Sequence, residues 1–126
     1  MTAVAKAMTL SEVWSEVLAP KFVRHREVLI AGAGPHGRRA LSLLGPAPGE
    51  SAIDIGCGFG DATAELAELV GPQGSALGLD LVPWFVEIAR QDTRGRGLAQ
   101  LRFAVADAAT YATAVPVDCL FARFGT

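Results

Sequence analysis

Apolar residues repeat at helical spacing near the start of this chain. In the stretch 10–19 (LSEVWSEVLA) the apolar positions share one face of a helix: Leu10, Val13, Trp14, Val17 and Leu18. Ser11 is expected at the helix start, and Pro20 is expected to end the helix. Residues 21–44 are predicted to form irregular helix with a glycine-rich bend, and GPAPGE at 45–50 is the clearest break in the chain.

After this break, short apolar runs alternate with amphipathic stretches of about ten residues. Strands are predicted at 51–56, 75–80, 101–107 and 117–122. One helix is predicted over 61–70, with its inward face formed by Leu66, Leu69 and Val70. Another begins near Pro83, which suits a first helical turn, and runs to about Gln91. Strands that alternate with helices in this way predict βαβ units and a parallel sheet of the α/β class.

A residue able to bind a ligand follows each predicted strand. The first strand ends in a glycine loop, the second in Asp80, the third in Asp107 and the fourth in Arg123. The carboxyl ends of parallel strands meet at one edge of a sheet, where open α/β sheets bind their ligands. Helix capping is the alternative role for an aspartate at such a position. Two of them in register with a glycine loop favour a binding site.

Two glycine-rich stretches compete for that site. In EVLIAGAGPHG (27–37), Gly32, Gly34 and Gly37 match the G-x-G-x-x-G of dinucleotide-binding proteins. A nucleotide-dependent oxidoreductase would use this stretch, and it would need a strand at 27–31. The helix that would follow, at 36–44, is short for a crossover between parallel strands. The first stretch is therefore expected to be helical.

The second stretch, AIDIGCGFGD (52–61), lies between a strong strand and a full-length helix. Its glycines at 56, 58 and 60 let the backbone approach a ligand closely. Asp54 before the loop and Asp61 after it would repel a diphosphate. We therefore expect a ligand that carries positive charge and no phosphate.

Composition and charge narrow the class further. The chain has 126 residues, 51% of them hydrophobic, which is enough for one globular domain. Its net charge of −2 gives no support for a nucleic-acid partner. The sequence has no apolar stretch long enough for a bilayer and no signal peptide, so no membrane association and a cytoplasmic location are predicted. His25 and His36 are expected at the surface or at helix caps.

The cysteines provide neither a disulfide framework nor a metal site. There are two, Cys57 and Cys119, with no ligand partners at zinc spacing, so no metal is predicted. Cys57 is interpreted as a packing residue rather than a nucleophile.

The residues of the second loop resemble those of a known family. D-I-G-C-G-F-G at 54–60, the strand-ending Asp80 and V-A-D-A at 105–108 look like the class I S-adenosylmethionine-dependent methyltransferases. The stretch at 117–126 (VDCLFARFGT) resembles the fourth-strand segment of the small-molecule enzymes of ubiquinone and menaquinone synthesis. The resemblance implies a Rossmann-like sheet with strand order 3-2-1-4, an N-terminal helical lead-in over 1–48, and a cofactor-binding half-domain over 49–126.

The family's cofactor and reaction are implied in the same way. S-adenosylmethionine would be bound, and its methyl group would pass to a small-molecule acceptor. Asp54 would favour the cofactor's positive charges, Asp80 would accept hydrogen bonds from the ribose, and Asp107 would bind the adenine amino group, with Leu81 and Ala108 beside the ring. The implied cofactor-binding residues are Asp54, Gly56, Cys57, Gly58, Gly60, Asp80, Leu81, Asp107, Ala108 and Arg123.

The acceptor end of the site is less defined by the sequence. The N-terminal segment, with Trp14 and Phe22, would shape the acceptor pocket, although Trp14 also suits a plain core position. His25, His36 and Tyr111 are candidates for a general base by residue type only, so the catalytic residues stay unassigned.

The family's sheet has seven strands, and this chain is expected to lack those after the fourth. The open edge of the fourth strand would then be a surface for self-association. A non-catalytic fragment that binds the cofactor is the alternative to an active methyltransferase.

Overall fold

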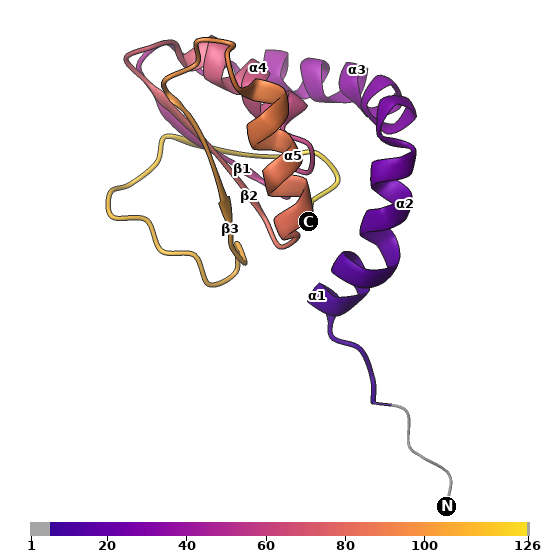
Figure 1. The fold of residues 1–126 in the computed structure, drawn as a ribbon. Coiled ribbons are helices and arrows are strands. Elements are labelled where there is room, and N and C mark those ends of the chain that lie inside the picture. The colour runs from indigo at the N-terminus through magenta and orange to yellow at the C-terminus, as the bar shows by residue number, and fades with distance from the viewer. Residues whose placement is uncertain (1–5, 126) are drawn as a thin grey trace, which may run out of the picture.

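The computed structural model describes residues 6–125 and contains a four-stranded parallel sheet flanked by helices (Figure 1). The strands are β1 (Ser51–Ile55), β2 (Ser75–Asp80), β3 (Leu101–Val105) and β4 (Cys119–Ala122). Their order is β3-β2-β1-β4, and every neighbouring pair is parallel. This confirms the predicted Rossmann-like α/β fold and its strand order.

Helices α4 (Asp61–Val70) and α5 (Pro83–Thr93) cover the same face of this sheet. The register places Ala52 beside Ala76 and Cys119, and Asp54 beside Gly78 and Phe121. The α4 side chains pack on this face in a core cluster of Leu41, Ala52, Ala62, Leu66, Ala67, Val70, Ala76 and Phe121. The α5 side chains pack on Phe103 in a second cluster. Successive right-handed crossovers that proceed in one direction place both helices on one side, as found here.

The opposite face of the sheet is apolar on β1, β2 and β4, with Arg102 of β3 beside Leu77. It carries Ile53, Leu77, Leu79 and Leu120, and α4 and α5 are both on the other side. Leu120 on the edge strand β4 is 58% exposed. Ile53 and Leu79 on this face are buried, so the exposed apolar surface lies at the free edge of β4.

The N-terminal part of the chain is helical up to the sheet. It comprises α1 (Leu10–Glu12), a π-helical segment η1 (Val13–Leu18), α2 (Ala19–Arg24) and α3 (Arg26–Leu44). Thr9, rather than the expected Ser11, caps α1 through a reciprocal capping box with Glu12. Figure 1 shows these helices as an arch that passes beside α5 and reaches α4.

Pro20 does not end the first helix, contrary to the sequence prediction. It occupies the first turn of α2, where a missing N–H costs little. The helical hydrogen bonding changes there from the π pattern to the α pattern.

In α4, the prediction that Leu69 faces inward was also wrong, because this residue is 44% exposed whereas Leu66 and Val70 are fully buried.

Residues 26–44 form one continuous helix, with Pro35 inside it. The break in helical structure falls at His25, not at the glycines, so the predicted bend within 21–44 lies earlier than expected. No strand is present at 27–31, which overturns the oxidoreductase alternative based on Gly32, Gly34 and Gly37. Gly45 then ends α3 with left-handed backbone, at the start of the predicted break.

No helix of the described chain combines the length and the apolar character needed to cross a bilayer.

Candidate cofactor site

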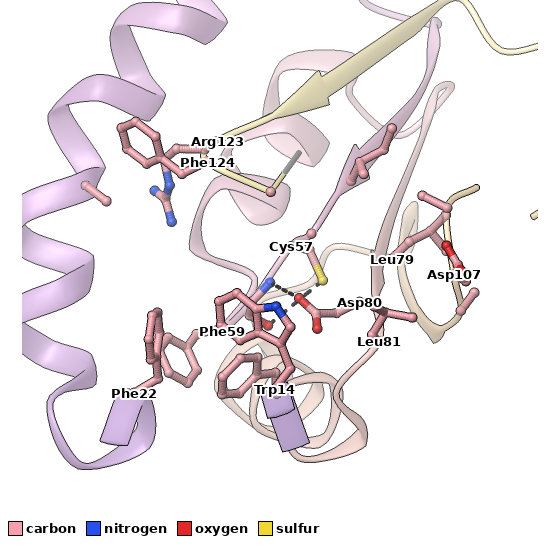
Figure 2. Close-up of a pocket in the computed structure, with 18 of the residues that line it drawn as sticks. Trp14, Phe22, Cys57, Phe59, Leu79, Asp80, Leu81, Asp107, Arg123 and Phe124 are labelled. Carbon is pink, nitrogen blue, oxygen red and sulfur yellow. Dashed lines mark hydrogen bonds between the residues drawn. The ribbon is translucent and has the colours of Figure 1, made fainter. Parts of the chain in front are cut away.

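A cavity of about 780 Å³ opens at the carboxyl edge of the sheet, between the strand ends and the N-terminal helices (Figure 2). A volume of this order suits a small-molecule ligand. Eight of the ten sequence-predicted residues line it: Gly56, Cys57, Gly58, Asp80, Leu81, Asp107, Ala108 and Arg123. The fold therefore brings the four strand ends to one cavity, as the parallel topology requires. The other two predicted residues, Asp54 and Gly60, lie behind its lining.

Asp80 is held in place by the backbone on both sides. Its Oδ2 accepts a hydrogen bond from the N–H of Gly58 at 2.9 Å, and its Oδ1 accepts one from the N–H of Val82 at 2.9 Å. Burial raises the pKa of this carboxyl group, and the backbone hydrogen bonds oppose that shift. Each oxygen has a second lone pair, so the carboxylate can accept further hydrogen bonds from a ligand.

The glycines of the loop have different roles. A Cβ atom added at Gly58 would meet no atom within 4 Å, and Gly58 lines the cavity. A Cβ atom added at Gly60 would lie 2.6 Å from Cζ of Phe103 and 2.8 Å from Cβ of Ala89. The missing side chain at Gly58 therefore exposes the backbone to the cavity. The missing side chain at Gly60 instead makes space for Phe103 and Ala89 beneath the loop.

Asp54 lies below the glycine loop and is 2% exposed. Thr63 on α4 donates a hydrogen bond from its hydroxyl to Oδ2 of Asp54 at 2.7 Å. Burial raises the pKa of Asp54 to about 7, against the opposing effects of Thr63 and Arg123. Asp54 thus connects the end of β1 to α4 and does not line the cavity, although the resemblance places it among the cofactor-binding residues.

Asp61 is paired with a cation, which the sequence did not reveal. Arg123 donates from Nη1 to Oδ2 of Asp61 at 2.7 Å and from Nη2 to Oδ1 at 2.8 Å. Both side chains are largely buried. Arg123 therefore offsets the negative charge that the sequence places at Asp61.

Asp107 lies two residues after β3, at the exposed rim of the cavity. Its Oδ1 accepts a hydrogen bond from the N–H of Ala109 at 2.9 Å, which closes a turn over Ala108. Asp107 lies on the side of the cavity opposite Arg123 (Figure 2).

Aromatic side chains close the end of the cavity near the N-terminal helices. Trp14 and Phe22 stand edge to face at 5.4 Å, Phe22 lies 6.1 Å from Phe85, and Phe85 lies 5.0 Å from Phe59. All four line the cavity, and Trp14 also packs on the core cluster around Phe85. Sequence reasoning missed Phe59 and Phe85, although Phe59 stands inside the quoted loop.

Cys57, His25 and His36 lie in different surroundings. Cys57 is buried, and burial raises the pKa of its thiol, which suits packing rather than nucleophilic attack. His25 is an exposed cap between α2 and α3, and the exposed His36 stands edge to face with Phe124 at 6.1 Å. In the part of the chain that the structure describes, no group of three or more potential metal-ligating side chains occurs.

The chain is similar in sequence to known methyltransferases. A family model described as a methyltransferase domain matches residues 46–123, more than half of the chain. Aklanonic acid methyltransferase DauC from Streptomyces sp. strain C5 is 42% identical over 76 residues, which are 60% of this chain and 34% of that protein. Demethylmenaquinone methyltransferase from Geobacillus stearothermophilus is 39% identical over 54 residues, 43% of this chain and 23% of that one.

Solved structures share the fold. A SAM-dependent methyltransferase from Thiobacillus denitrificans, in complex with S-adenosyl-L-homocysteine, is 27% identical with a TM-score of 0.53. The match covers 65% of this chain and 34% of that one. The chain thus spans about a third or less of the length of these relatives.

Proposed function

This chain belongs to the class I S-adenosylmethionine-dependent methyltransferases, and on that premise we propose that it transfers a methyl group from this cofactor to a small-molecule acceptor. The cofactor supplies an activated methyl group on a sulfonium. The chain would bind and orient the two reactants and exclude water from between them. The observation that carries the proposal is the cavity in which Gly58, Asp80 and Asp107 converge from three strand ends.

The groups that line this cavity suit the parts of the cofactor. Asp80, fixed by two backbone N–H groups, presents free lone pairs that can accept hydrogen bonds from the ribose hydroxyls. Asp107 can accept one from the adenine amino group, with Leu81 and Ala108 beside the ring. The bare backbone at Gly58 leaves room for the amino-acid end.

The acceptor is proposed to lie at the aromatic end of the cavity. Leu10, Trp14, Phe22, Leu29 and Ile30 line that end, and all of them come from the N-terminal helices. An apolar, aromatic lining of this kind binds apolar ring systems by burial and stacking. Because these residues precede residue 49, the division into a lead-in over 1–48 and a cofactor-binding part over 49–126 fits the proposal.

We further propose a cytoplasmic location and self-association through the free edge of β4. Both cysteines of the chain are free thiols, which suits a reducing compartment. The apolar Leu120 and Phe124 are strongly exposed at or after the edge strand, and exposed apolar edges favour pairing with another chain.

Calorimetric titration of the purified chain with S-adenosylmethionine tests the main proposal. We expect saturable binding that Asp80→Asn weakens by about tenfold or more, because one carboxylate oxygen becomes a donor that faces a backbone N–H. Asp92→Asn is the matched control, since Asp92 is exposed on α5 and, among residues 6–125, pairs with Arg26 alone, at 3.5 Å. NAD in place of S-adenosylmethionine should give no binding. Equal affinity of wild type and Asp80→Asn would remove the assigned site.

A further inference from the structure

The turn after β4 touches parts of the chain that lie far apart in the sequence. Arg123 makes its two hydrogen bonds to Asp61, the first residue of α4. Gly125 lies against Gly56, so closely that a Cβ atom on Gly56 would be 2.7 Å from Cα of Gly125. This turn therefore contacts the loop between β1 and α4 at both of its ends.

The ion pair in this turn is the most enclosed of those among the described residues. The side chains of Arg123 and Asp61 are 16% and 19% exposed, whereas at least one partner in each of the other pairs is 42% exposed or more. Two parallel, charge-assisted hydrogen bonds also fix orientation better than a single contact does. A pair of this kind holds its two elements in one relative position.

The guanidinium group of Arg123 packs against α3 at Gly37. A Cβ atom added at Gly37 would lie 3.0 Å from Cδ and 3.1 Å from Nη1 of Arg123. Gly32 in the same helix has open space at the corresponding position, with no atom within 4 Å. The last glycine of GAGPHG is thus explained by contact with Arg123 and not by a nucleotide.

We propose that Arg123 is a positioning residue for the cofactor, which holds the Gly56–Gly60 loop in its binding shape by pairing with Asp61 across the surface left open by Gly37. The inference rests on the proposed function, since it concerns the loop assigned to S-adenosylmethionine. The turn that carries Arg123 meets both ends of this loop, with Arg123 paired to Asp61 and Gly125 in contact with Gly56. It also lines the cavity, so its displacement would change the surface that the cofactor meets.

The test measures the dissociation constant for S-adenosylmethionine and the melting temperature of a set of variants. Arg123→Gln should weaken binding by about 10- to 100-fold, the range for loss of hydrogen bonds to a charged group. Arg38→Gln is the matched control, because Arg38 forms a long, exposed pair with Glu65 at 3.9 Å and its loss should leave binding unchanged.

A double-variant cycle separates positioning from general loss of stability. Asp61→Asn combined with Arg123→Gln should bind no more weakly than the weaker of the two single variants, because both remove the same interaction. Arg123→Lys, which keeps the charge but loses the paired geometry, should fall between wild type and Arg123→Gln. A structural role alone would lower the melting temperature of Arg123→Gln and leave its dissociation constant unchanged, which would overturn the proposal.

Glycine substitutions provide a test that leaves Arg123 in place. Gly37→Ala should weaken binding several-fold, while Gly32→Ala should not, although both add one methyl group to α3. Equal binding by these two variants would overturn the proposal. If the wild-type chain itself fails to bind S-adenosylmethionine, the proposed function fails; binding by wild type with no loss in Arg123→Gln refutes the positioning role alone.

Discussion

Replacement of Gly60 by alanine should destabilise the fold by the sum of two separate effects. Gly60 has φ of 80°, and an alanine in left-handed backbone costs about 1–2 kcal/mol. The added methyl group would also lie within 2.8 Å of both Phe103 and Ala89, and overpacking of a core costs about 1–3 kcal/mol. We therefore expect Gly60→Ala to lower the free energy of unfolding by about 2–5 kcal/mol.

Gly97→Ala isolates the backbone effect. Gly97 has a similar φ of 70°, but a Cβ atom there would have no neighbour within 4 Å. Its replacement should cost only about 1–2 kcal/mol. Urea unfolding followed by tryptophan fluorescence gives both values, since Trp14 and Trp84 report on the N-terminal helices and on α5. If Gly60→Ala is no less stable than Gly97→Ala, the packing of Phe103 beneath the loop is refuted.

Three other predictions concern charge, thiol chemistry and assembly. The pKa of Asp54 is raised from 3.8 to about 7 on folding, so the native state keeps this proton while the unfolded state releases it. The free energy of unfolding should therefore fall by up to about 4 kcal/mol as pH rises from 4 to 7. Denaturant titrations at several pH values should show this fall in wild type and not in Asp54→Asn. Cys119 should react with a thiol reagent well before Cys57 in the native chain, and equal rates followed by absorbance would contradict the burial of Cys57. Sedimentation velocity should show association that Leu120→Lys abolishes, while Leu43→Lys, at an exposed position on α3, leaves it intact; a monomeric wild type at high concentration would contradict the β4 edge proposal.

The strands and helices of the sheet were predictable because each is bounded by strong turn residues. The predicted strands contain all four observed ones; β2 matches at both ends, and each of the others differs by one or two residues at one end. The helix at 61–70 matches α4 at both ends. Apolar runs between glycine and proline turns leave little freedom for the position of a strand in an α/β chain.

The ion pair between Asp61 and Arg123 could not be predicted in the same way. It joins residues 62 positions apart, and it depends on the register of β1 with β4, where Ile55 lies beside Ala122. Side-chain contacts across strands that are distant in sequence follow from this register, which local patterns do not contain. Phe59 and Phe85 were missed because their contacts join a loop and helices that are distant in the sequence, which local patterns do not contain either.

The position of Asp54 did leave a trace in the sequence. Alternation along β1 places it on the same face as Ala52, which is the face that α4 covers. Thr63, in the first turn of α4, is the hydroxyl that this carboxyl group needs. The alternation of side chains along β1, together with Thr63, therefore indicates that Asp54 lies beneath the glycine loop.

Asp80 accepts one hydrogen bond from the loop after β1 and one from the start of α5, so these two segments share a single anchor. Any opening of one should carry the other with it, and their motions should have a common rate constant. Relaxation dispersion of the amides of Gly58 and Val82 should then fit one two-state exchange process. The rate of ligand binding would then be set by a single step, in which the carboxylate of Asp80 breaks and re-forms its two backbone hydrogen bonds.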